Sequence, residues 1–104
     1  MSGKNSDIQD DSSIKDSIRT DEPQMYKVIL HNDDYTTMEF VIEVLMTVFN
    51  KSVDEANEIM LNVHRKGKGI CGIYTFDIAI TKVISVKDMA FQNEFPLKCT
   101  MERD

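Results

Sequence analysis

Residues 25–45 read MYKVILHNDDYTTMEFVIEVL, and this stretch decides the fold. Residues 25–30 are mostly β-branched, aromatic or long apolar side chains, which predicts a strand. Residues 32–35 follow as a turn, because Asn and Asp side chains can bond nearby backbone amides. Thr36 with Glu39 three residues later matches a capping box, which predicts that a helix begins there. A strand thus leads through a polar turn directly into a helix.

Beyond this stretch, apolar residues at helical spacing carry the first helix to Phe49. Ser52 and Glu55 repeat the capping box and open a second helix, which we expect to stop at Gly67. A short apolar run at 70–74 then predicts the second strand.

The segment 76–91 is ambiguous, because it is rich in β-branched residues that are poor helix formers. It has no turn residue in its middle, however, and it is longer than a normal strand. Its apolar residues fit a broad helical stripe, so we predict a third helix with Thr75 as N-cap. Residues 93–96 break this helix, and residues 97–101 alternate as a last strand.

The predicted order is therefore β-α-α-β-α-β. A small three-stranded antiparallel sheet, packed against three helices on one face, would bury all the apolar stripes together. This is an α+β domain, which we expect at residues 25–104. Residues 1–24 carry six acidic and three basic side chains with only three isoleucines, and this composition predicts a disordered arm.

Composition and charge exclude several classes of protein. No run of eighteen apolar residues or secretory signal is present, so we expect a cytoplasmic protein without a membrane partner. Cys71 and Cys99 lack CxxC spacing and are expected to be reduced. The net charge of −6 argues against nucleic acid and anionic membranes as partners. A monomer is the simplest expectation.

The polar candidates for a site are the run His31, Asn32, Asp33 and Asp34 after the first strand and His64 near the end of the second helix. His64 shares a helical face with Met60 and adjoins Val63, so it should face the edge of the core. Amide, carboxylate and neutral imidazole groups accept hydrogen bonds, and an ammonium group donates three. From the residues alone, a turn that starts a helix and an ordinary edge histidine are the stronger explanation of the same pattern.

An enzyme is a poor interpretation of this sequence. No Ser, His and Asp set is arranged for nucleophilic attack, and no glycine-rich phosphate loop is present. His31, Asp33, Asp34 and His64 are possible metal ligands, but their spacing supports no metal site. We therefore expect no catalytic residue, no metal and no cofactor.

Three blocks of the chain resemble the ClpS adaptor family. They are MYKVILHNDDYTTMEFV at 25–41, MLNVHRKGKGICG at 60–72 and NEFPLKCTME at 93–102. The blocks occur in the family's order and intervals, and the resemblance covers residues 25–104. It implies an adaptor that holds N-degron proteins by a free N-terminal Leu, Phe, Tyr or Trp. Such adaptors deliver these substrates to a ClpA-type or ClpC-type AAA+ unfoldase for degradation by ClpP.

The resemblance also implies residue roles. The α-amino group would be bound by Asn32, Asp33 and His64. The hydrophobic pocket would be formed by Met38, Val41, Met60, Val63 and Leu97, with Met38 as a gate against β-branched side chains. The N-terminal domain of the unfoldase would dock on Tyr35, Asp77 and Lys82. The arm at 1–24 matches the family's mobile extension, which engages the unfoldase pore.

Some positions depart from the family pattern. Thr37 stands where many relatives carry Pro, and Asp77 stands where Glu is expected. His31 adds a titratable group of unassigned role. Three alternatives stay open: a ribosomal stalk-type domain, a metal-dependent hydrolase, and an adaptor that docks without binding N-degrons. The acidic balance disfavours the first, the lack of ligand spacing the second and the intact pocket residues the third.

Overall fold

The computed structural model describes residues 22–104, so residues 1–21 of the expected arm lie outside the described part. The expected order β-α-α-β-α-β and the α+β class are confirmed. The elements are β2 (Met25–His31), α2 (Met38–Thr47), α3 (Val53–Lys66), β3 (Lys68–Thr75), α4 (Phe76–Gln92) and β4 (Lys98–Arg103).

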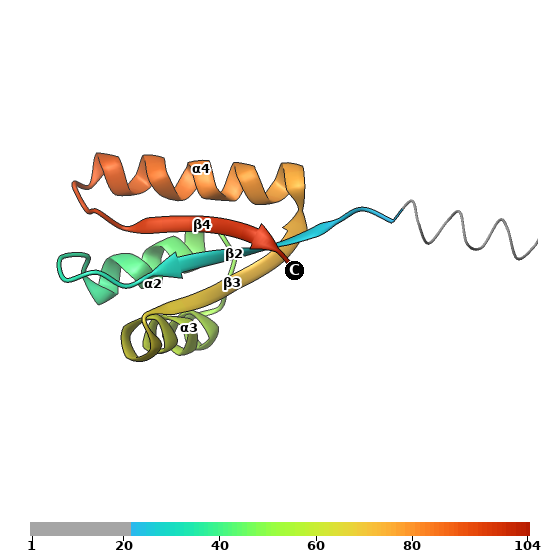
Figure 1. Cartoon of the computed structure of the whole chain (residues 1–104). Coiled ribbons are helices and arrows are strands. Elements are labelled where there is room, and N and C mark those ends of the chain that lie inside the picture. Colours follow the sequence, from blue (N-terminus) through green and yellow to red (C-terminus); the bar gives the residue numbers. More distant parts are fainter. Residues whose placement is uncertain (1–21) are drawn as a thin grey trace, which may run out of the picture.

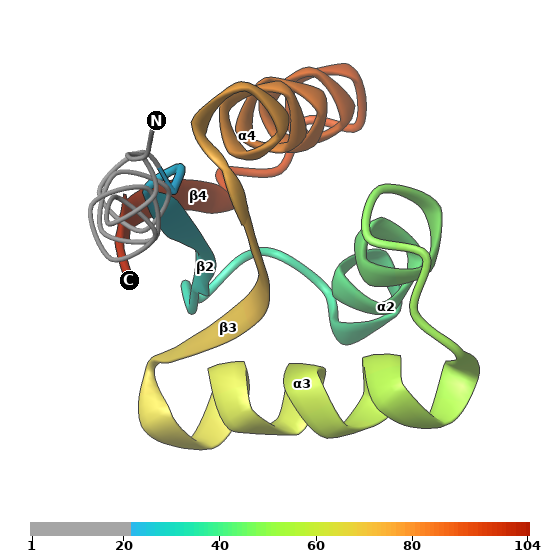
Figure 2. The ribbon, with the colours of Figure 1, turned by 90° about the vertical axis from the view of Figure 1, so that its right-hand side faces the viewer.

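The sheet has the strand order β3-β2-β4, and both pairings are antiparallel. The first strand in sequence is therefore the central one (Figure 1). The register with β3 shifts between Val28 and Ile29, which face Gly72 and Ile70, so that Cys71 is the extra residue of a bulge. Helices α2, α3 and α4 all lie on one side of the sheet (Figure 2).

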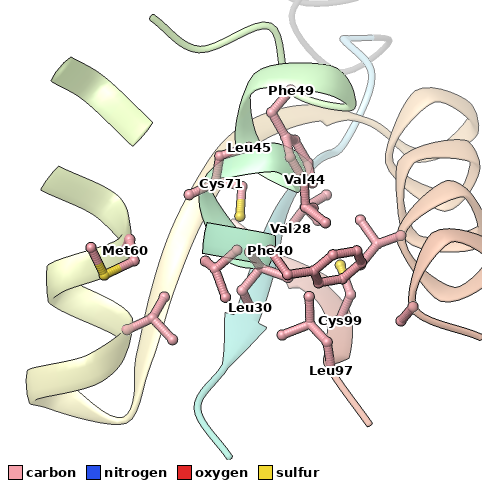
Figure 3. Close-up of a cluster of buried hydrophobic side chains, with 14 of the residues drawn as sticks. Val28, Leu30, Phe40, Val44, Leu45, Phe49, Met60, Cys71, Leu97 and Cys99 are labelled. Carbon is pink, nitrogen blue, oxygen red and sulfur yellow. The ribbon is translucent and has the colours of Figure 1, made fainter. Parts of the chain in front are cut away.

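The core lies between the sheet and the three helices. Val28 and Leu30 of β2 belong to it, whereas Ile29 between them points to the opposite face, as strand alternation requires. The aromatic rings of Phe40 and Phe95 pack at a centroid distance of 4.8 Å. Figure 3 shows side chains of this cluster converging from all layers: Val28, Leu30, Phe40, Val44, Leu45, Phe49, Met60, Cys71, Leu97 and Cys99.

The start and end of α2 differ from the prediction. The N-cap is Thr37, whose side-chain oxygen accepts a hydrogen bond from the amide of Phe40 at 3.1 Å. The Thr36 hydroxyl instead donates a hydrogen bond to the Asp33 carboxylate, so Thr36 does not cap the helix. The helix ends at Thr47, before Phe49. Phe49 is nevertheless buried, which explains why its apolar position suggested two further helical residues.

The other helix signals are confirmed. Ser52 and Glu55 form the reciprocal capping box of α3, and Gly67 ends this helix in the left-handed conformation with φ 92°. Helix α4 spans 17 residues despite its β-branched content, because its small and branched apolar residues are buried against the sheet. Thr75 precedes α4 in an extended conformation, but its side chain makes no capping hydrogen bond. None of these helices is long and apolar enough to cross a bilayer.

Candidate functional site

A cavity of about 210 Å³ lies between the loop after β2, the first turns of α2 and the last turns of α3. It brings together every residue predicted for the ammonium site and the hydrophobic pocket except Leu97. The residues that line it are Asn32, Asp33, Asp34, Thr36, Met38, Val41, Met60, Val63 and His64.

A backbone hydrogen bond holds the two polar sides of this cavity together. The amide of Asn32 donates to the carbonyl of Gly67 at 2.9 Å. Gly67 is the C-cap of α3, and His64 lies in the last turn of that helix. The loop is therefore fixed to the end of α3 that carries the imidazole, although Asn32 and His64 are far apart in sequence.

The carboxylate of Asp33 organises the loop. Its Oδ1 accepts hydrogen bonds from the amides of Tyr35 at 2.8 Å and Thr36 at 2.7 Å, and its Oδ2 accepts from the Thr36 hydroxyl at 2.7 Å. Partial burial disfavours the charged form, but these three hydrogen bonds outweigh it and lower the pKa of Asp33. Asp33 is thus a charged group with a fixed orientation at the edge of the cavity.

Asp34 and Thr36 also line the cavity. Asp34 belongs to the predicted polar run but was not assigned to the ammonium site, and Thr36 was expected only to cap a helix. Asp34 is exposed, and no hydrogen bond or ion pair to its side chain occurs within residues 22–104. Its carboxylate has no role in the loop comparable to that of Asp33. Of the predicted polar run, Asn32, Asp33 and Asp34 all line the cavity.

The remaining wall of the cavity is apolar. Val41, Met60 and Val63 are at most 7% exposed and connect the cavity floor to the core. Met38, in the first turn of α2, is 44% exposed and stands at the rim. The site therefore combines hydrogen-bond acceptors and negative charge on one side with an apolar floor on the other. Such a site can bind a cation attached to an apolar group.

Leu97 was expected in the pocket, but it is not among the residues that line this cavity. It lies just before β4, is 5% exposed and packs within the core near Phe40 and Cys99 (Figure 3). It belongs to the same core cluster as Val41, Met60 and Val63, which line the cavity. A resemblance in sequence names such a residue without saying whether it touches the cavity surface.

Asp77 and Lys82, predicted for unfoldase docking, line a second and larger hollow of about 470 Å³ between α4 and the end of α2. The Nζ of Lys82 donates to the carbonyl of Val48 at 2.7 Å and lies 5.6 Å from the centre of the Tyr74 ring. Tyr35 is not part of this group. It follows the His31 end of β2, whereas Asp77 follows Thr75, which pairs with the opposite end.

Neither cysteine is placed for surface chemistry. Cys71 and Cys99 are buried and unpaired, and burial raises the pKa of both thiols, that of Cys99 to about 12. Among residues 22–104, no cluster of three His, Cys, Asp or Glu side chains is arranged to hold a metal ion. The exposed histidine at the cavity therefore has no such partners in the described part of the chain.

Comparison with known proteins identifies the family. The family model described as "ATP-dependent Clp protease adaptor protein ClpS" matches residues 21–100. The chain belongs to the ClpS family. It is thus a non-catalytic adaptor of the Clp protease, and the expectation that it is not an enzyme is confirmed.

Its ClpS relatives are similar over most or all of the chain. The Clp protease adapter ClpS of Syntrophus aciditrophicus is 62% identical over 81 residues, which cover 78% of this chain and 76% of the relative. That of Desulforapulum autotrophicum is 52% identical over 104 residues and the full length of both chains. The structure of Agrobacterium tumefaciens ClpS2 bound to L-phenylalaninamide is 41% identical with a TM-score of 0.77. The match covers 80% of this chain and 100% of the Agrobacterium chain.

Proposed function

We propose that this ClpS adaptor binds the free α-amino group and the bulky apolar first residue of N-degron proteins. The bound residue would be Leu, Phe, Tyr or Trp, and the substrate would pass to a ClpA-type or ClpC-type AAA+ unfoldase for degradation by ClpP. One observation carries the proposal: acceptors from the loop and α3 share a single cavity with an apolar floor.

The polar side of the cavity suits an ammonium group. Asn32 and His64 can accept hydrogen bonds from it, and the carboxylates of Asp33 and Asp34 supply negative charge. Asp33 accepts three hydrogen bonds within the loop, but only one of them goes to its Oδ2, which keeps an acceptor site for the amine. Asp34 adds a second carboxylate at the cavity, and its side chain accepts no hydrogen bond among the described residues.

The apolar side suits the first side chain. Val41, Met60 and Val63 form a floor that would remove an aromatic or Leu side chain from water. Met38 at the rim would contact the substrate near its Cβ and exclude Val and Ile, which are branched there. The related Agrobacterium protein supports this, because L-phenylalaninamide presents a free α-amino group next to a benzyl side chain.

Delivery requires a second surface, which we place around Asp77 and Lys82. Their hollow lies at the C-terminal end of α2 and shares no residue with the substrate cavity at the first turns of that helix, so we expect substrate and unfoldase to bind at the same time. Tyr35, at the other end of the sheet, would form a separate contact with the unfoldase N-terminal domain. We propose a cytoplasmic monomer that binds neither nucleic acid nor membrane, in keeping with an ATP-dependent protease as partner.

Fluorescence anisotropy with peptides that differ only in their first residue tests the proposal. Leu-initiated and Phe-initiated peptides should bind, whereas a Val-initiated or N-acetylated Leu peptide should bind at least about tenfold more weakly, equivalent to about 1.4 kcal/mol. His64→Ala should weaken binding, and Arg65→Ala, one residue along the same helix, should not. Equal binding of free and acetylated peptides would refute recognition of the α-amino group.

A further inference from the structure

The face of the sheet opposite the helices is uncovered in the described part of the chain (Figure 2). Directly opposed residues of antiparallel strands share a face. This open face, as we call it, contains three rows across the strands: Lys27 with Ile73 and Glu102, Ile29 with Ile70 and Thr100, and His31 with Lys68 and Lys98.

The middle of the open face is apolar. Ile29 is 3% exposed, whereas its neighbours Ile70 and Ile73 are 50% and 46% exposed. A shallow hollow of about 450 Å³ lies over Ile29 and Ile70 and is bordered by Lys66 at the end of α3. Exposed apolar surface next to a concave site is typical of a surface that binds another segment.

The border of the open face is basic, although the whole chain has a net charge of −6. Lys27, Lys66, Lys68 and Lys98 surround the apolar centre, and Glu102 is the acidic side chain among them. Within residues 22–104, the ion pair found there joins Lys27 to Glu102 at 3.7 Å. These lysines also affect His31. Its pKa is lowered first by burial and then by the positive charges of Lys98 and Lys68.

We propose that the open face is the docking site for residues 8–18 of the same chain. This segment reads IQDDSSIKDSI. Its three isoleucines match an apolar centre, and its three aspartates against one lysine match a basic border. The segment is negatively charged and the border of the face is positively charged, so their attraction favours this occupant over a basic segment.

The connection between segment and face has the required length. The arm joins the sheet at Met25, where β2 begins. Gln24, the residue before it, is held at this end of the sheet because its side chain accepts a hydrogen bond from Nε of Arg103 at 3.0 Å. The seven residues from Ile18 to Met25 can span about 23 Å when extended. Ile29 lies four residues along β2, about 14 Å from Met25. The segment can therefore fold back over the centre of the open face.

Docking there would leave both proposed working surfaces accessible. The substrate cavity and the hollow at Asp77 and Lys82 lie among the helices, on the other side of the sheet. The inference does not depend on N-degron binding, and its test needs no substrate.

A spin label on a Ser13→Cys variant of the full chain tests this docking by NMR. The native cysteines will not compete for the label, because both are buried and burial raises their thiol pKa values. The label should broaden the amide signals of Lys68, Ile70 and Ile73 severalfold more than that of Lys87, which is exposed on α4.

Charge reversal provides the matched comparison. Lys66→Glu with Lys68→Glu should abolish most of this extra broadening, whereas Lys87→Glu should leave it unchanged. Salt at about 1 M, which shortens the Debye length to about 3 Å, should reduce it as well. Uniform broadening of all amides would overturn the proposal. So would broadening of an unlabelled ¹⁵N chain mixed with spin-labelled chain, because that result would assign the face to a second copy.

Discussion

The amide of Asn32 donates a hydrogen bond to the carbonyl of Gly67 at 2.9 Å, which joins the end of β2 to the end of α3. This bond places the two halves of the proposed ammonium site in one position without using any of their side chains. The side chains of Asn32 and His64 are therefore left to contact a ligand. Gly67, in the left-handed conformation, provides the carbonyl for this bond.

Gly67→Ala should lower the free energy of unfolding by about 1 kcal/mol, because a non-glycine residue is strained at positive φ. The added Cβ would meet no atom within 4 Å, so the effect comes from the backbone alone. Urea denaturation measures it, and Gly67→Asn should cost less because Asn tolerates this conformation. Equal stability of the Ala variant and the parent would show that the C-cap does not require glycine.

Gly69→Ala should disturb the cavity floor. Its Cβ would lie 2.9 Å from Cγ2 of Val63, which lines the cavity, so Val63 must move or the strand must shift. Overpacking of this kind typically costs about 1–3 kcal/mol of stability. We expect weaker binding of a Phe-initiated peptide by anisotropy, with a second variant, Gly69→Ala plus Val63→Ala, recovering stability. Unchanged affinity in the single variant would argue that Val63 does not contact the ligand.

The lowered pKa of Asp33 predicts a dependence of stability on pH. The folded state favours the carboxylate, so its contribution is present above the unfolded pKa of about 3.9 and is lost as pH falls through the folded pKa. Asp33→Asn should therefore reduce stability at pH 7 and flatten its decline below about pH 4. Asp88→Asn on the exposed side of α4 is the control. Parallel pH curves for Asp33→Asn and the parent would contradict the assignment.

Asp34→Asn separates binding from folding. Because the Asp34 side chain makes no hydrogen bond among residues 22–104, its neutralisation should leave the urea midpoint unchanged. Its loss of negative charge at the cavity should weaken a Leu-initiated peptide by roughly tenfold, about 1.4 kcal/mol. Titration calorimetry of the Asp33→Asn and Asp34→Asn variants compares the two. If only Asp33→Asn lost affinity, the carboxylate that contacts the amine would be Asp33.

Lys82→Met keeps most of the side-chain stem but removes the charge over Tyr74 and the hydrogen bond to Val48. We expect weaker binding to an isolated ClpA-type or ClpC-type N-terminal domain. The stability loss should be about 1 kcal/mol, because Val48 lines the hollow and water can replace the lost ammonium group at its carbonyl. Asp77→Asn, in the same hollow, should weaken docking with little loss of stability. Lys87→Met is the control on α4. Normal docking of both Asp77→Asn and Lys82→Met would remove this surface from the proposed mechanism.

The sequence predicted most of the fold because its signals are local and agree with one another. Ser52 with Glu55 and the glycine at position 67 mark the two ends of α3, and both are confirmed. The predicted start of α2 was wrong because Thr36 and Thr37 can each cap a helix. Asp33 accepts a hydrogen bond from the hydroxyl of Thr36, which leaves Thr37 as the cap. That competition is a tertiary feature of the loop, which spacing alone does not reveal.

The site was predicted less completely than the fold. The loop residues and those of α3 were recognised by chemistry and by resemblance, and the structure brings them to one cavity. Leu97, expected in the pocket, is not among the residues that line the cavity, and Tyr35 lies at the opposite end of the sheet from Asp77. A sequence pattern names residue types in order along the chain. It does not show which layer of the core a side chain occupies or which end of a sheet a loop leaves.

The central position of β2 has a consequence for the order of folding. Its residues have no strand partner nearby in the chain, and the contact of His31 with Thr100 spans 69 positions. Closing such loops costs entropy before the strand pairs reward it. By contrast, α3 is closed at both ends by local contacts. We therefore expect α3 to form early and the sheet to assemble late, with mutations in β4 acting chiefly on the unfolding rate.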